Sequence, residues 1–425
     1  MATLIPVQTS PVQTKPAFAP AIPQNFEELG IKQSLVRDLM LRRLLLEGYS
    51  SLRGIGKSLR LSIPVVDAIF RHMRQQQLVE VKGMDGNDYN FSLSTAGKTL
   101  AAERFQITQY AGSCPVSLSE YASATKLQSA TVHIDRMVLR SAFSDLVISD
   151  RLLDQLGPAL ISQNSIFVYG PTGNGKTSIA ERMLRVYDDG VLIPYSVEVD
   201  NQIINLYDPV VHQPMDMDDA EIDPRWIRCR RPCIVVGGEL IPSMLELRLD
   251  EASGIYAAPL QMKANNGILI IDDFGRQLMS PRDLLNRWIV PLDRRVDYLT
   301  LRYGVKFQIP FELMVVFSTN LEPADLADEA FLRRIHNKIY VEAVDAKAFD
   351  EIFRRVVTAR GLIPEFDGAE FLRKICLREG RTELRACYPG DICNILVSIG
   401  RYEGRPPNMT KGDVERATAL YFAKG

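Results

Sequence analysis

A glycine-rich segment from Gly170 to Thr177 constrains this chain more than any other feature. Its residues match the phosphate-loop pattern G-x-x-x-x-G-K-[ST] at every fixed position. The apolar run Ser165–Tyr169 before it is typical of a strand, and Thr177–Leu184 after it is typical of a helix. This order places backbone N–H groups and a helix N-terminus around a bound phosphate. The segment therefore predicts a nucleoside triphosphate site in an α/β fold with a parallel sheet.

The predicted ligands of the triphosphate come from this loop and the first helical turn. The expected contacts are Gly170, Pro171, Thr172, Gly173, Asn174, Gly175, Lys176, Thr177 and Ser178. Lys176 is expected to reach the β- and γ-phosphates of ATP and to act in catalysis, and the Thr177 hydroxyl to bind Mg²⁺. The sequence thus predicts ATP and Mg²⁺ as ligands.

A second motif consists of the apolar run Ile268–Ile271 followed by Asp272 and Asp273. Four consecutive apolar residues predict a strand that is buried on both faces. Ligands of parallel sheets lie at the carboxyl ends of the strands, so both carboxylates are candidates for the nucleotide site. Asp272 is expected to bind Mg²⁺, and Asp273 to orient or deprotonate the attacking water.

Two further motifs follow in the sequence. The apolar run Leu313–Thr319 predicts another buried strand, and the amide of Asn320 after it is expected to reach the γ-phosphate or the attacking water. Arg333 and Arg334 lie at the end of a predicted helix. An arginine placed on the γ-phosphate of a neighbouring subunit accelerates hydrolysis by about 10³–10⁵-fold. Arg334 is the first candidate for this role and Arg333 the second.

In this order the four motifs resemble those of the AAA+ ATPase superfamily. Gly170–Thr177 is similar to its Walker A motif, Ile268–Asp273 to Walker B, Asn320 to sensor 1, and Arg334 (or Arg333) to the arginine finger. The resemblance covers residues 131–425 and implies ATP hydrolysis in an oligomeric ring, with a homo-hexamer as the expected assembly. Lys263 and the segment 298–307 resemble the helix-2-insert branch, which includes the MoxR-type ATPases. The chain also resembles predicted chaperone-like ATPases associated with pilus assembly.

Two positions depart from the AAA+ pattern. Walker B usually ends in Asp-Glu, whereas here Asp273 retracts the carboxylate by one methylene. A penalty of about 10²–10⁴-fold in hydrolysis is expected unless the backbone compensates. The family's sensor 2 arginine would fall on Gly390 or Cys393, and Arg385, one turn earlier, is the candidate substitute. A slowly hydrolysing, nucleotide-gated scaffold is therefore one alternative function.

Composition changes along the chain divide it into five expected parts. They are a disordered Pro-rich tail (1–24), a winged-helix-like domain (25–105), a linker (106–130), an AAA+ α/β nucleotide-binding domain (131–342) and a helical lid (343–425). The tail holds five prolines and almost no charged or aromatic residue, so it has nothing to bury. Three helical patterns followed by a hairpin at 78–93 resemble a winged helix.

The segment 25–105 carries 12 Lys and Arg residues against 9 Asp and Glu residues. Duplex DNA binding needs several cations along the phosphates, and Arg60, Arg71 and Arg74 are candidates for such a track. Asp67 opposes it, and an outward-facing Val65 is better suited to a protein surface. A protein client or assembly factor is therefore the expected partner of residues 25–105. A DNA-binding ATPase or transcription regulator is the alternative.

Bulk properties point to an ordinary globular chain. The net charge of the 425 residues is −2, so no overall attraction to nucleic acid or anionic membranes is expected. No stretch approaches the roughly 18 apolar residues of a membrane span, and the N-terminus lacks a secretory pattern. Six scattered cysteines do not form a disulfide framework. The sequence therefore predicts a cytoplasmic protein without membrane insertion.

Overall fold

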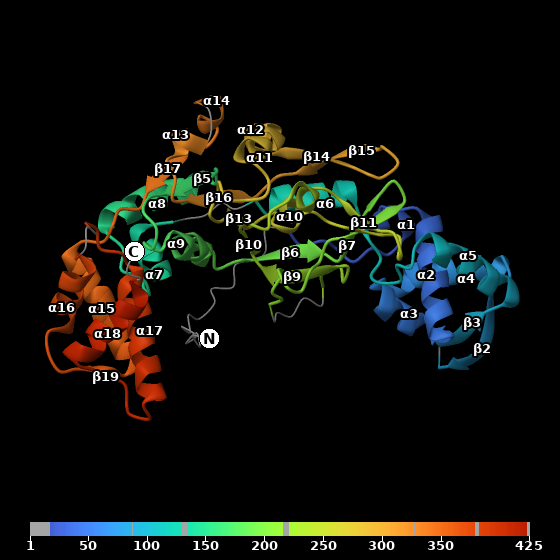
Figure 1. The fold of residues 1–425 in the computed structure, drawn as a ribbon. Helices are drawn as coiled ribbons and strands as arrows, with labels where there is room; N and C mark the ends of the chain where they lie inside the picture. Colours follow the sequence, from blue (N-terminus) through green and yellow to red (C-terminus); the bar gives the residue numbers. More distant parts are fainter. Residues whose placement is uncertain are drawn as a thin grey trace.

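The computed structural model describes residues 18–86, 88–129, 134–215, 221–326, 329–378 and 382–422. Figure 1 shows four parts along the molecule: an N-terminal domain at one end, a β-rich middle domain, a parallel-sheet core, and a C-terminal helical bundle at the other end.

The N-terminal domain packs five helices around a small antiparallel sheet. Its helices are α1 (Phe26–Leu29), α2 (Gln33–Glu47), α3 (Leu52–Leu59), α4 (Ile63–Gln75) and α5 (Thr95–Ile107). Its strands β1 (Tyr49–Ser51), β2 (Val79–Asp85) and β3 (Asp88–Leu93) lie in the order β1-β3-β2. Ser51 and Ser94 cap α3 and α5 through their hydroxyl oxygens. Val65, expected on the outer face of α4, is instead completely buried in the core, because α4 turns this side towards the other helices.

The middle domain combines segments that are distant in the sequence. Its five-stranded sheet has the order β11 (Arg248–Asp250), β12 (Ile255–Ala257), β8 (Gln202–Asn205), β7 (Ser196–Val199), β4 (Val116–Ser117). The antiparallel pair of β6 (Gly190–Pro194) and β9 (Trp226–Arg230) shares its core with α6 (Leu118–Leu127). The hairpin of β14 (Val296–Thr300) and β15 (Lys306–Pro310) packs into the same core. The β14–β15 hairpin, which contains the segment 298–307, is therefore buried on one face against this domain, through Leu299, Phe307 and Ile309.

Two parts of the predicted organisation differ from the structure. The segment expected as a linker, 106–130, contains β4 and α6, because Tyr121 and Ala124 bury against the middle domain. The last residues of the expected tail are also packed: the Phe18 ring lies 5.2 Å from that of Trp226, edge to face. Residues 1–17 of that tail lie outside the described residues.

The parallel-sheet core is a five-stranded sheet in which every neighbouring pair is parallel. Its order is β10 (Cys233–Val236), β13 (Ile268–Ile271), β16 (Met314–Thr319), β5 (Ile166–Tyr169), β17 (Asn337–Tyr340). One face packs against α7 (Arg136–Ala142), α8 (Asp150–Ser162), α9 (Lys176–Arg182) and η1 (Met183–Val186). The other packs against η2 (Pro242–Leu245), α10 (Leu260–Lys263), α11 (Pro281–Arg287) and α12 (Ile289–Arg294), with α13 (Pro323–Leu326) and α14 (Glu329–Leu332) beyond β16. The predicted α/β class with a parallel sheet core is confirmed.

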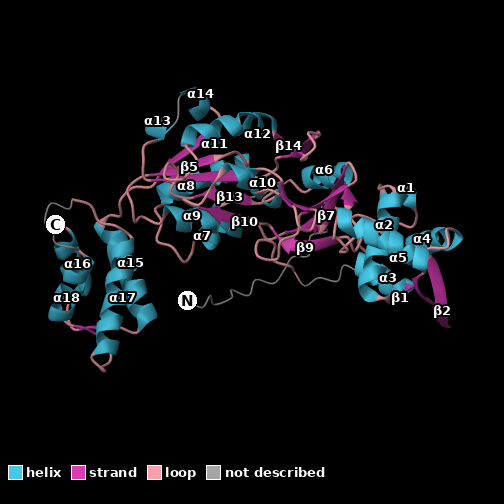
Figure 2. Cartoon of the chain, turned by 45° about the vertical axis from the view of Figure 1, so that its right-hand side comes forward, coloured by secondary structure: helices cyan, strands magenta, loops and turns pink. Residues whose placement is uncertain are grey.

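Four helices form the C-terminal bundle, which Figure 2 shows beside the sheet rather than within it. They are α15 (Ala346–Arg360), α16 (Gly368–Cys376), α17 (Cys387–Tyr402) and α18 (Lys411–Tyr421), with the short parallel pair β18 (Ile363–Pro364) and β19 (Asn408–Met409). Their apolar faces share one core, which includes Phe349, Leu372 and Ile392. Among the described residues, no helix is long and apolar enough to span a membrane.

Candidate nucleotide-binding site

The strand register brings three of the sequence motifs to one edge of the parallel sheet. Thr319, the last residue of β16, pairs with Tyr169, the last residue of β5. Ile271, the last residue of β13, pairs with Phe317 two residues before the end of β16. The loop from Gly170, the carboxylates from Asp272 and the amide of Asn320 all follow these strand ends. Ligands of parallel sheets occupy this edge.

The loop from Gly170 to Gly175 needs glycine at defined positions. Gly170, Gly173 and Gly175 have φ values of +134°, +80° and +79°, which L-amino acids with a side chain rarely adopt. A Cβ atom on Gly170 would also lie 2.4 Å from the carbonyl oxygen of Val341. Gly175 directly precedes α9, so the loop leads into a helix N-terminus. This backbone provides the N–H donors that an anion requires.

Lys176 lies inside the loop with 9% of its surface exposed. Its Nζ donates to the carbonyl oxygens of Gly170 and Pro171, both at 3.0 Å. Burial lowers the pKa of Lys176, while the negative charges of Asp273 and Asp272 oppose this shift. The lysine charge is thus held between the loop and the two carboxylates.

The two expected magnesium ligands contact each other. The Thr177 hydroxyl donates to Oδ2 of Asp272 over 2.8 Å, although the two residues are 95 positions apart in the sequence. A hydroxyl and a carboxylate oxygen are the ligand types that Mg²⁺ prefers, and it commonly binds one or two protein carboxylates together with substrate phosphates. The residues present therefore fit this ion.

The other predicted catalytic residues occupy different surroundings. Asp273 is exposed and has a left-handed φ of +49°. Asn320 is half-buried at the end of β16. Arg334 lies beyond α14 and forms an ion pair with Asp293 of α12, in which Nε is 2.8 Å from Oδ2. Arg333 next to it is exposed.

The C-terminal bundle contacts the tip of the loop through hydrogen bonds from its main chain, which the sequence did not predict. The N–H of Cys387, at the start of α17, donates to the Gly173 carbonyl over 2.9 Å. The N–H of Ala386 donates to Oδ1 of Asn174 over 3.2 Å. Arg385 is adjacent: a Cβ atom on Gly173 would lie 3.3 Å from its Cδ, and its charge further lowers the pKa of Lys176. The candidate substitute arginine is therefore close to the phosphate loop.

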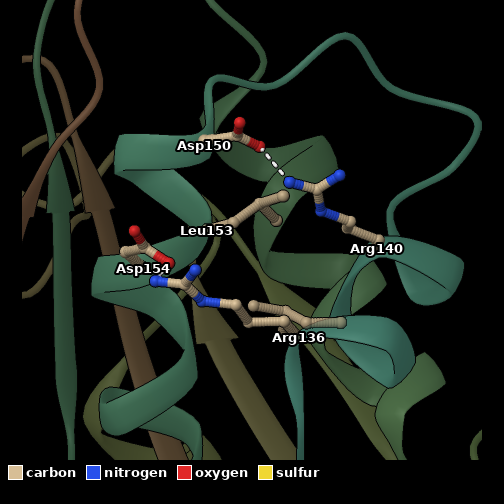
Figure 3. Close-up of a pocket in the computed structure, with 6 residues that line it drawn as sticks. Arg136, Arg140, Asp150, Leu153 and Asp154 are labelled. Carbon is tan, nitrogen blue, oxygen red and sulfur yellow. Dashed lines mark hydrogen bonds and ion pairs between the residues drawn. The ribbon is translucent and has the colours of Figure 1, made fainter.

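A shallow cavity of about 50 Å³ lies elsewhere, between α7 and α8 (Figure 3). Two ion pairs border it, Arg136 with Asp154 and Arg140 with Asp150, each at 2.9 Å. None of the predicted site residues lines this cavity. It is separate from the nucleotide-binding edge.

Comparisons with known proteins give one family match in the C-terminal bundle and similarities to solved structures over about two thirds of the chain. A family described as a domain of unknown function, DUF8689, matches residues 345–420, which span the C-terminal bundle. A comparison with curated proteins gives no match. Similar solved structures include the RuvB Holliday junction branch migration motor of Thermotoga maritima (TM-score 0.37, 12% identity, covering 69% of this chain and 72% of that chain). Another is NtrX from Brucella abortus in complex with ATP (TM-score 0.40, 15% identity, covering 68% and 59%).

Proposed function

We propose that this chain is a Mg²⁺-dependent AAA+ ATPase that works as an oligomeric ring, a homo-hexamer, and remodels a protein client. The observation that supports it best is the hydrogen bond between Thr177 and Asp272 beside the phosphate loop. Two segments that the sequence identifies separately as nucleotide ligands lie together at the carboxyl edge of a parallel sheet. The contacts of Cys387 and Arg385 with Gly173 at the loop tip support a lid role for the C-terminal bundle.

Each residue has a role that follows from its chemistry. The loop amides and the N-terminus of α9 bind the phosphate oxygens, and Lys176 adds a positive charge. Thr177 and Asp272 would hold Mg²⁺, which would neutralise part of the negative charge of the triphosphate when bound. Asp273 accepts a proton from the attacking water, and Asn320 orients that water. These roles together describe hydrolysis by positioning and electrostatic stabilisation.

Replacing Lys176 with alanine tests nucleotide binding directly. We expect ATP to bind about 10–100-fold more weakly, because a hydrogen bond to a charged group contributes about 1.5–3 kcal/mol. Titration of a fluorescent ATP analogue measures the dissociation constant, and Lys82→Ala, on the exposed hairpin of the N-terminal domain, is the matched control. Equal affinity of Lys176→Ala and the unaltered protein would refute the proposed site.

For the N-terminal domain we propose a winged-helix-like module that binds a protein client. Two of the three arginines that were candidates for a phosphate track are engaged within the protein. The guanidinium of Arg60 lies over the Tyr195 ring of the middle domain, 4.0 Å from its centroid. Arg71 forms an ion pair with Asp67 on the same helix at 2.7 Å. Arg74 is exposed on α4, but one cation does not make a phosphate track.

A salt titration distinguishes this module from a DNA reader. We expect no duplex DNA binding at low salt, because the basic residues do not form a continuous track. Fluorescence anisotropy of a labelled duplex with the full chain, at two salt concentrations, measures the effect. Tight binding that weakens steeply with salt, and that Arg74→Ala reduces, would instead favour the DNA-binding ATPase or transcription regulator.

A further inference from the structure

The turn that follows β13 has an unusual backbone. Asp273 has a φ of +49° and Gly275 a φ of +105°. For an L-residue the left-handed conformation costs about 1–2 kcal/mol, although aspartate adopts it more readily than most. A residue is held in this conformation only where its surroundings stabilise the turn. The contacts around Asp273 therefore show what sets its direction.

One side chain, Gln277, makes three hydrogen bonds to this turn. Its Nε2 donates to the carbonyl oxygens of Asp272 and Asp273 over 2.8 and 3.1 Å. Its Oε1 accepts the N–H of Gly275 over 2.8 Å. Both functional atoms of the amide are thus used on the backbone that carries the two carboxylates.

The neighbouring strand β16 fixes the same turn from the other side. The N–H of Phe274 donates to the Ser318 carbonyl over 2.7 Å. The Thr319 hydroxyl donates to the Phe274 carbonyl, also over 2.7 Å. Thr319 directly precedes Asn320, so the turn and the end of β16 form one hydrogen-bonded unit.

This turn changes where the second carboxylate points. In an extended strand successive side chains alternate between the two faces of the sheet, so an extended Asp273 would point away from its neighbour. Asp272 contacts Thr177. The left-handed φ of Asp273 interrupts this alternation. The turn therefore allows the carboxylate of Asp273 to lie on the same side of the sheet edge as that of Asp272.

We propose that Gln277 is a positioning residue that holds Asp273 in its left-handed conformation and so directs the short carboxylate at the attacking water. The proposal rests on the ATPase function proposed above. Gln277 acts only through the turn, so it sets the hydrolysis rate and leaves ATP binding unchanged. The turn geometry is the compensation for the methylene that Asp273 lacks relative to glutamate.

The test measures kcat, KM and ATP affinity in the full-length protein. Gln277→Ala is expected to lower kcat by about 10–100-fold, because a shift of about 1 Å in a reacting group costs on the order of 10²-fold. ATP affinity is expected to stay within about 2-fold, since Lys176 and Thr177 are unaffected. Gln75→Ala, on the exposed surface of α4, is the matched glutamine control. Unchanged kcat in Gln277→Ala would overturn the proposal.

A second pair of variants tests the positioning role of Gln277 if Gln277→Ala fails to fold. Gln277→Met and Gln277→Glu keep the length of the side chain, but neither can donate to the carbonyl oxygens of Asp272 and Asp273, so both should lower kcat. Unchanged kcat in either folded variant would contradict the proposal.

A double variant separates positioning from a general structural effect. In an Asp273→Asn background, Gln277→Ala should lower the residual rate by less than about 2-fold, because the group that it positions no longer acts. A full additional loss would mean that Gln277 acts independently of Asp273. An unaltered protein that binds ATP without any turnover would refute hydrolysis itself, whereas turnover that is insensitive to Gln277 refutes only the positioning role.

Discussion

The Arg333→Ala variant is expected to hydrolyse ATP about 10³–10⁵-fold more slowly than the unaltered protein, with nearly unchanged ATP affinity. An arginine that completes a neighbouring subunit's site must project from its own surface. Arg333 is exposed, whereas Arg334, the first candidate from the sequence, is bound to Asp293. We therefore expect Arg334→Ala to have the smaller effect. Steady-state ATPase rates of both variants measure the difference.

A mixing experiment tests whether the arginine acts between subunits. Lys176→Ala subunits do not hold ATP firmly but still carry Arg333, and Arg333→Ala subunits have the converse defect. A mixture of these two inactive proteins should regain part of the activity, because some interfaces combine an intact loop with an intact arginine. Full activity of Arg333→Ala together with loss in Arg334→Ala would assign the role to Arg334. Full activity in both would exclude a trans arginine at this position.

Asp273→Asn is expected to lower kcat by about 10²–10⁴-fold, because the amide cannot accept the proton of the attacking water. Asparagine also tolerates the left-handed conformation at φ +49°, so the turn should persist and ATP should still bind. A lower kcat of Asp273→Asn relative to the unaltered protein would therefore reflect chemistry rather than folding. Single-turnover hydrolysis and ATP titration on the same samples separate the two steps.

The Asp273→Glu variant provides the matched comparison. Glutamate is less suited than aspartate to a left-handed residue, and its longer side chain would overshoot a site shaped for the shorter one. We expect Asp273→Glu to be slower than the unaltered protein. A large gain in rate on this change, from a very slow unaltered protein, would instead support the nucleotide-gated scaffold. Equal rates for Asp273→Asn and the unaltered protein would lead to the same conclusion.

The meeting of these motifs at one edge of the sheet was predictable because its signals are local in the sequence. The loop at Gly170–Thr177 and the run before Asp272 each combine a strand pattern with a polar end, and parallel pairing then brings the ends together. The left-handed turn at Asp273 was not predictable from these patterns. Gln277 and Thr319 donate hydrogen bonds to its backbone, and no periodicity reveals these contacts.

The middle domain was missed for a different reason. Its sheet takes strands from segments around residues 116, 200 and 255, so no single stretch carries its pattern. The Ser- and Ala-rich segment from 116 to 130 resembled a linker in composition. Its residues 118–127 form α6 instead, because Tyr121 and Ala124 are buried by residues far away in the sequence.

The buried Arg225 of the middle domain has a mechanical consequence. Its guanidinium is paired with Asp223 at 2.7 Å, and Nη1 donates to the carbonyl oxygens of Leu29 and Pro115 over 3.2 and 3.1 Å. Gln109 adds a main-chain bond to Ser253 across the same junction. The N-terminal domain is therefore fixed to the middle domain by buried contacts rather than joined to it by a flexible linker. Under the proposed function, a conformational change at the phosphate loop would be transmitted rigidly to a protein bound at the N-terminal domain.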